Sequence, residues 1–490
     1  MPGCDQARPA CSRCARLNIA CIGCGQQRFK FKDETPNLRA ADKQLSRRPP
    51  ATARAATAGA LLDPSRALTN PTALTAGAFV SVLEITDPRY DLFCYGTFMN
   101  EIPLQLGRHE ALDASAEALA SCFSCVHTGN VSTSSIGKYV RALNAVQKCL
   151  QNPATAYSGE TLCAIYLIML VQVSSPRHFF DWRALTISKG WIGKDDDSFP
   201  QHGQAMAHLL GVVVARELND PRSAVMLITL TVSVLLESIF NPDIQLEPWL
   251  STLAEAHRPA APVQNVEGVV VTCLELQNMS LMTEILRHPM QHISQMRSLY
   301  QIVRLDFPGL RKHLLEIIEP ACSGPLEKLP LVLVRLQTRY QAAYCLLLSM
   351  GMTLNGMLRA LNPYDLLLGE EMDTYCAEML DLAERAKGRR PFGASHIPLG
   401  LLSAWAAVDD ESQRPAIRSM IAEYDVGFAS VNWQAKAELL RPAYDTVRRR
   451  LAVYNLSSPD PGDVSDDSGC AMEDLNCMVA YKKKDACCIL

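Results

Sequence analysis

Residues 135–152, with the sequence SIGKYVRALNAVQKCLQN, space their apolar side chains as an α-helix requires. Tyr139, Leu143, Val146 and Leu150 follow one another at steps of four, three and four residues. Because an α-helix turns once in about 3.6 residues, these side chains line one face, which an amphipathic helix buries against its neighbours. The stretch therefore predicts a helix packed on other helices.

The same spacing recurs over most of the chain. It is found in residues 158–173, 202–218, 223–240, 274–286, 331–350, 373–387 and 433–451. Prolines between these stretches predict helix starts or stops, at Pro221, Pro259, Pro262, Pro308, Pro320, Pro325, Pro363 and Pro391. Alternating β-branched runs are few, and no repeat of fixed length stands out. We therefore predict an all-α fold, with an irregular multi-helix domain over residues 78–454.

The composition indicates a large folded body behind a basic arm. The 490 residues are 48% hydrophobic, which is enough to bury an extensive core. The net charge is -4, whereas residues 1–60 hold eleven Lys and Arg against four Asp and Glu, a difference of +7. The chain as a whole therefore lacks the charge of a polyanion-binding protein, and its first part has it.

Three apolar stretches, residues 161–173, 223–240 and 342–358, predict buried helices and no transmembrane span. The first is shorter than the roughly 20 residues that a span needs, and the others contain polar side chains such as Glu237 and Asn355. No secretory signal pattern opens the chain, so we expect its cysteines to be reduced. The nine cysteines from Cys94 to Cys376 are expected to be small core residues.

Two segments differ from the helical body in composition. Residues 35–77 consist largely of Ala, Thr, Pro and Arg, which predicts a disordered linker. Residues 455–490 are polar and acidic with interleaved Met, Leu and Val, which predicts a disordered tail of the composition known from activation segments.

The chain begins with a cysteine-rich module over residues 1–34. Cys4, Cys11, Cys14 and Cys21 are spaced C-x6-C-x2-C-x6-C, and Cys24 follows. Zinc prefers tetrahedral thiolate sites, in which C-x2-C is the recurrent half-unit. The spacing therefore predicts a zinc site.

The run CDQARPACSRCARLNIACIG, residues 4–23, resembles the second half of the fungal six-cysteine binuclear zinc cluster. The resemblance implies that Cys4, Cys11, Cys14 and Cys21 take the roles of the third to sixth ligands. The family's first C-x2-C pair and the basic helix behind it would precede Cys4 and do not occur in this sequence. One zinc ion still finds four thiolates, because either Cys4 or Cys24 completes the set; the alternatives are the family's two ions in a complete module, or none.

Basic side chains accompany the module. Arg8, Arg13 and Arg16 lie between its cysteines, and GQQRFKFKDE, residues 25–34, resembles the basic segment that follows the cluster in this family. We expect these arginines, together with Arg28, Lys30 and Lys32, to contact DNA phosphates, which provides affinity without sequence information. Residues 139–172, 202–211 and 401–421 resemble parts of the helical regulatory domain of the same factors.

The resemblance implies a zinc-dependent, DNA-binding transcriptional regulator of RNA polymerase II promoters that acts in the nucleus. Its partners would be duplex DNA and either a second copy or related regulators. The alternative is a truncated interaction protein that does not bind DNA and acts through its helical domain. No G-x-S-x-G, H-E-x-x-H, G-x-G-x-x-G after a strand, or P-loop is present, so we predict that the chain is not an enzyme.

The last four residues, CCIL, fit the C-a-a-X pattern of a prenylated chain, with Cys487 as the possible lipid acceptor and Lys482 to Lys484 just upstream. Cys488, however, occupies a position that is usually aliphatic. We therefore do not expect membrane anchoring, and the lysines also suit a nuclear-import patch.

Overall fold

The computed structural model describes Arg16 and residues 70–128, 132–174, 202–217, 221–238, 243–256, 269–324, 329–427 and 433–457. The chain divides into two compact units, Met1–Ala67 and Leu68–Leu490. In the first unit only Arg16 is described, as an exposed helical residue, so the fold below is that of the second unit. Helices make up its regular structure and no strand occurs in the described ranges, which confirms the all-α prediction.

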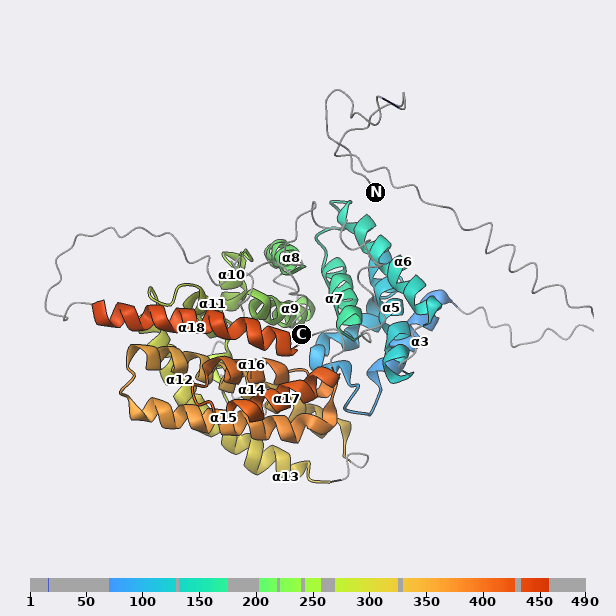
Figure 1. Cartoon of the computed structure of the whole chain (residues 1–490). Coiled ribbons are helices and arrows are strands. Elements are labelled where there is room, and N and C mark those ends of the chain that lie inside the picture. The colour runs from blue at the N-terminus through green and yellow to red at the C-terminus, as the bar shows by residue number, and fades with distance from the viewer. Residues whose placement is uncertain are drawn as a thin grey trace, which may run out of the picture. The chain divides into compact units, whose positions relative to one another are not determined.

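The described ranges in the first part of this unit contain eight α-helices and two short 3-10 turns (Figure 1). In chain order they are α3 (Pro71–Leu83), the turns η1 (Leu92–Tyr95) and η2 (Thr97–Glu101), α4 (Ile102–Gln105), α5 (Glu110–Thr128), α6 (Thr133–Leu150), α7 (Gly159–Ser174), α8 (His202–Glu217), α9 (Pro221–Ser238) and α10 (Trp249–Ala256). Their buried side chains form one hydrophobic cluster, which we call the N-terminal core.

The second part forms a separate hydrophobic cluster, the C-terminal core. Its main elements are α11 (Leu276–Arg287), α12 (Ile293–Lys312), the π-helical η5 (His313–Ile318), α13 (Glu319–Ala321), α14 (Leu331–Leu361), α15 (Leu366–Ala386), α16 (Ile397–Ala407), α17 (Arg414–Gly427) and α18 (Trp433–Ser457). The long helix α14 packs against α12, α15, α16 and α18 and is buried along most of its length.

Local sequence signals explain several helix starts. Asn70 accepts a hydrogen bond from the backbone of Thr72 (3.0 Å) and Pro71 follows it, so α3 begins within the stretch that composition marked as linker. Asp365 caps α15 by accepting from the backbone amides of Leu367 and Leu368. A side-chain oxygen at the N-cap satisfies amides that have no partner inside the helix.

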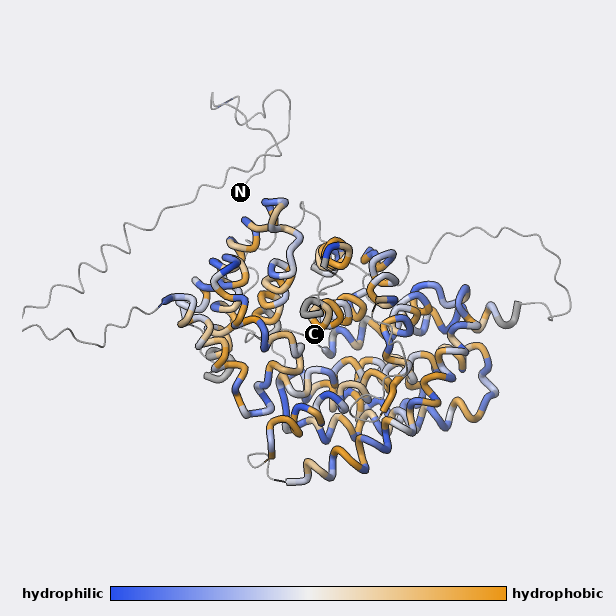
Figure 2. Tube along the Cα trace, turned by 180° about the vertical axis from the view of Figure 1, so that it is seen from behind, coloured by the Kyte–Doolittle hydropathy of each residue, from blue (hydrophilic) through white to orange (hydrophobic). Residues whose placement is uncertain are grey.

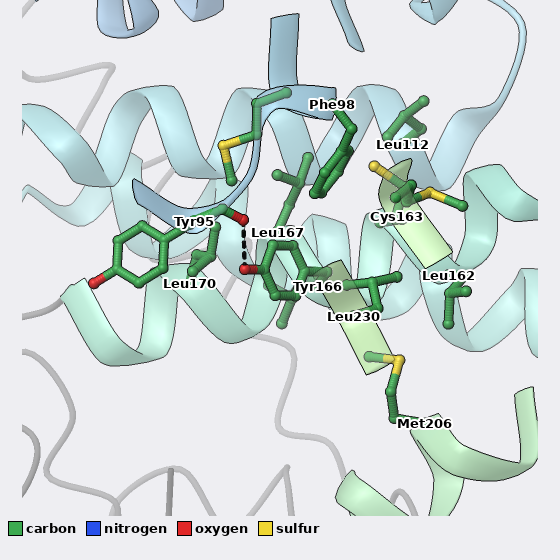
Figure 3. Packing of buried hydrophobic residues seen from close by; sticks show 14 of the residues in the cluster. Tyr95, Phe98, Leu112, Leu162, Cys163, Tyr166, Leu167, Leu170, Met206 and Leu230 are labelled. Atoms are coloured by element: carbon green, nitrogen blue, oxygen red, sulfur yellow. Dashed lines mark hydrogen bonds between the residues drawn. The ribbon is translucent and has the colours of Figure 1, made fainter. Parts of the chain in front are cut away.

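Each predicted helix overlaps an observed one, although α14 ends at Leu361 where residue 350 was predicted and α15 begins at Leu366 where residue 373 was predicted. Residues 135–152 correspond to α6, and the predicted stretch 202–218 corresponds to α8. Figure 2 shows hydrophobic and hydrophilic positions alternating along most helices, as amphipathic helices require. Figure 3 shows the result in the N-terminal core, where Leu162, Tyr166 and Leu167 of α7 are enclosed by neighbouring elements.

One proline prediction is wrong. Pro308 lies inside α12 and does not stop it. Proline deprives the carbonyl four residues earlier of its helical donor. Pro308 and Gly309 are both exposed, so this turn of α12 faces solvent, where water can bind the freed carbonyl.

The prediction of buried cysteines is confirmed at six of the eight cysteines whose burial is described and is wrong for Cys94 and Cys322, whereas the prediction of apolar helices holds in the described ranges. Cysteines 122, 149, 163, 273, 345 and 376 are buried, whereas Cys94 is exposed and Cys322 is partly exposed. The three long apolar stretches lie in α7, α9 and α14, and none of the described helices combines the length and apolar character of a membrane span.

Candidate functional site

The residues that sequence analysis assigned to zinc and DNA lie outside the described ranges, with one exception. Arg16 is described and is exposed, as a phosphate contact requires. The assigned cysteines (Cys4, Cys11, Cys14, Cys21, Cys24 and Cys487) and the other basic residues (Arg8, Arg13, Arg28, Lys30 and Lys32) are not described. In the described ranges, no group of three or more His, Cys, Asp and Glu side chains is arranged to hold a metal ion.

The most elaborate polar and aromatic contacts in the described part join the two cores. They lie between residues 88–94, which belong to the N-terminal part, and residues 387–396, which connect α15 to α16. We call this region the joint. It also includes Arg335 of α14.

Phe392 fixes the joint on the apolar side. This residue of the C-terminal part is 2% exposed and belongs to the N-terminal core. Its ring contacts those of Tyr90, Tyr95 and Phe123 at centroid distances of 6.3, 6.0 and 6.0 Å. Such tilted and edge-on aromatic pairs stabilise a contact beyond their buried area.

The backbone of the same segment is bound as well. The Phe392 amide donates to the carbonyl of Arg89 (3.0 Å), and the Cys94 thiol lies 3.4 Å from the Phe392 carbonyl, which accepts from it. Gly393 follows, and a Cβ there would collide with the Pro88 carbonyl oxygen. The close approach of the two segments therefore requires glycine at this position.

The backbone of Tyr95 is in turn bound by helix α7. The Tyr166 hydroxyl of α7 donates to the Tyr95 carbonyl at 2.8 Å, the bond drawn in Figure 3. Helix α7 thus fixes the backbone that presents the Tyr95 ring to Phe392.

Arg335 forms the polar side of the joint. Its guanidinium donates to both carboxylate oxygens of Asp91 at 2.8 and 3.0 Å and to the Leu83 carbonyl at 3.0 Å. It also lies 4.4 Å from the centroid of the Phe93 ring. The side chains are only 19% and 10% exposed for Arg335 and Asp91, so this two-point pair is largely withdrawn from water.

Arg389 anchors the same segment on α14. It is 7% exposed and donates to Thr338 and Gln341 at 3.3 Å each and to Gln337. Burial lowers the pKa of Arg389. The hydrogen-bond partners are all neutral, and the Gln341 amide donates in turn to Glu319 (3.3 Å), which brings a carboxylate close to the buried cation.

Three ion pairs follow one another along α15; we call them the ladder and each pair a rung. Glu371 pairs with Arg304 (2.7 Å) and Glu378 with Arg311 (2.6 Å), and the hydroxyls of Tyr300 and Tyr344 donate to the same two carboxylates. The third rung joins Arg385 to Glu319 at 3.2 Å. The rungs are seven residues apart on α15, so they lie on one face of that helix.

The residues that pair with α15 are not all spaced by seven. Arg304 and Arg311 are, but Glu319 comes eight residues after Arg311. The π-helical segment His313–Ile318 lies between them, and a π-turn takes one residue more than an α-turn. The extra residue is what places Glu319 opposite Arg385.

Two buried thiols of the C-terminal core, Cys345 and Cys376, are suited to packing and not to nucleophilic attack. Burial raises the pKa of Cys345 to about 12, and burial likewise raises that of Cys376 to about 12. A thiol is a nucleophile in its thiolate form, which these environments disfavour at neutral pH. The arrangement therefore suits a mechanical role, in which the joint holds two helical cores together.

Sequence analysis did not identify the joint. The run RRPFG, residues 389–393, combines two arginines, a proline, an aromatic residue and a glycine in one short connection, and that was the available signal. The partners of Phe392 and Gly393 in residues 88–95, however, lie some three hundred positions earlier in the chain, beyond the reach of periodicity. Comparison of this chain with known protein families, with curated proteins and with solved structures yields no match.

Proposed function

We propose that this chain is a zinc-dependent transcriptional regulator that binds duplex DNA through its N-terminal module and acts in the nucleus on RNA polymerase II promoters. The observation that carries the proposal is the spacing of Cys4, Cys11, Cys14 and Cys21 among basic residues, ahead of an all-helical body. That order, a small thiolate module followed by a large helical domain, is what the resemblance to the fungal zinc-cluster factors implies.

The module would bind one zinc ion through four thiolates, with Cys4 or Cys24 as the fourth ligand. Zinc binding and folding of such a small peptide are coupled, because the free module buries too little apolar surface to be stable alone. Arg8, Arg13 and Arg16 would then contact phosphates in a fixed arrangement. The helical body would receive regulatory partners.

The test is DNA binding by the full chain with and without a zinc chelator, followed by fluorescence anisotropy of labelled duplexes. We expect binding that is lost on chelation, restored by added zinc, and weakened steeply as salt rises, because phosphate contacts release counterions. Cys14→Ser should remove binding, whereas Cys94→Ser, in a cysteine of the helical body, should leave it unchanged. Binding that persists in full without zinc would refute the proposal.

A second candidate is an interaction protein that acts through its helical domain without reading DNA. It is favoured by the turn between α14 and α15, where Tyr364 is 90% and Leu366 is 82% exposed although Asp365 holds the turn in a well-capped form. Exposed apolar side chains on an ordered turn are typical of contact surfaces.

This candidate predicts no preference among DNA sequences and a specific protein partner. We expect Leu366→Glu to abolish the association and Glu370→Gln, an exposed change one turn further along α15, to preserve it. Sequence-specific, zinc-dependent DNA binding by a chain that forms no complex would exclude the second candidate in favour of the first.

A further inference from the structure

The described part of the second unit has two hydrophobic cores and few elements that serve both. Helix α11 is one of them, because Met279 belongs to the N-terminal core whereas Met282, Ile285 and Leu286 belong to the C-terminal core. At its end, Arg287 donates to the carbonyls of Ser238 (3.0 Å) and Ile244 (3.3 Å), just after α9. Helix α11 is therefore attached to both cores.

The joint is another such place in the described ranges, and its construction differs. The side chains of Phe392 and Arg335 reach across to residues 90–95 and to Phe123, and two hydrogen bonds join the Phe392 backbone to residues 89 and 94. Contacts made by a few long side chains are lost together when they separate, whereas interdigitated cores are not. The joint thus has the form of a clasp.

We propose that the helical body opens and closes as a hinged pair of cores, with α11 as the hinge and the joint as the clasp. In the closed form Phe392 fills the space between Tyr90, Tyr95 and Phe123, and Arg335 is bound to Asp91. In the open form these contacts are released while each core keeps its own packing. The inference concerns the helical body alone and does not depend on the function of the N-terminal module.

Hydrogen exchange of the full chain, followed by mass spectrometry, tests the proposal. Phe392→Ala and Arg335→Met remove the two parts of the clasp. We expect both to accelerate exchange in peptides that cover residues 88–94 and 387–396 by at least about tenfold, with little change in α15 and α18, because a local opening exposes only the amides that it frees.

Two matched variants control for the loss of a side chain as such. Phe307→Ala removes an aromatic residue that stacks on Tyr344 within the C-terminal core, and Arg304→Met removes the partner of Glu371. Neither should accelerate exchange at the joint in preference to α15.

Two results would overturn the proposal. One is exchange that accelerates equally at the joint and throughout α15 and α18 in the clasp variants, because the cores would then separate only on global unfolding. The other is unchanged exchange at the joint in both. Phe392→Leu, which keeps most of the buried volume, is measured in parallel and should give a smaller acceleration of the same peptides if Phe392→Ala folds poorly.

Discussion

His396 should make the stability of the C-terminal core depend on pH. The residue is the N-cap of α16, its Nε2 is buried without a hydrogen-bond partner in the described structure, and its carbonyl accepts from the Cys345 thiol at 3.2 Å. Burial, and secondly the charge of Arg389, lower the pKa of His396 from 6.5 to about 3. The positive end of the α16 dipole acts in the same direction.

The sign follows from proton binding. Between pH 6.5 and about 3 the unfolded chain binds a proton at His396 and the folded chain does not, so the free energy of unfolding falls as the pH falls through this window. Each pH unit is worth about 1.4 kcal/mol, so acidification from about pH 8 to about pH 5 costs about 2 kcal/mol at this residue.

The assay is urea unfolding followed by tryptophan fluorescence, since Trp405 and Trp433 are both buried in this core. His396→Gln should remove the pH-dependent part and lose about 2 kcal/mol less than the wild type over this range. His313→Gln, in which the lost ring stacks on Tyr340, controls for removing a histidine elsewhere in the same core. Equal losses in the wild type and in His396→Gln would show that the folded protein protonates His396 freely and would refute the reasoning.

Two further predictions concern packing in the same core. Gly400→Ala should lower the free energy of unfolding by about 1–3 kcal/mol, because a Cβ there would lie 2.7 Å from the Cys345 sulfur and would also collide with Met379; an unchanged urea midpoint would contradict the tight packing. Asn355→Leu removes a fully buried amide that donates to the Leu368 carbonyl at 2.8 Å, so we expect a loss of about 1–3 kcal/mol in thermal unfolding, and a stabilised variant would show that this carbonyl needs no donor.

Much of the fold could be predicted from the sequence because it rests on local signals. The steps from Tyr139 to Leu150 identify α6, since helical periodicity is a property of neighbouring residues. The end of α14 could not be located in the same way. The periodic pattern stopped at Met350 and a separate apolar stretch predicted a buried helix over residues 342–358, whereas one helix runs from Leu331 to Leu361, because a helix buried on most sides loses the polar face that marks its period.

The contacts of the joint could not be predicted from the sequence. Whether a phenylalanine in a connection is exposed or fills another core depends on which distant segments meet it, and Tyr90 and Phe123 are far from Phe392 in sequence. The zinc and DNA assignments remain predictions from spacing alone, since of their residues only Arg16 belongs to the described part of the chain.

The π-helical turn at His313–Ile318 holds one residue more than an α-turn. The number of residues in this turn therefore decides which side chain lies opposite Arg385. If the same residues were wound as a regular α-helix, Ile318, seven residues after Arg311, would take the position opposite Arg385, and an arginine would face a hydrocarbon. A single-residue deletion in this turn leaves Glu319 seven residues after Arg311 and restores the α-helical spacing, so it should be tolerated better than the same deletion between Arg304 and Arg311, which are already seven residues apart. Related chains would therefore be expected to keep the spacing from Arg304 to Arg311 and to tolerate either a π-turn or a turn one residue shorter before Glu319.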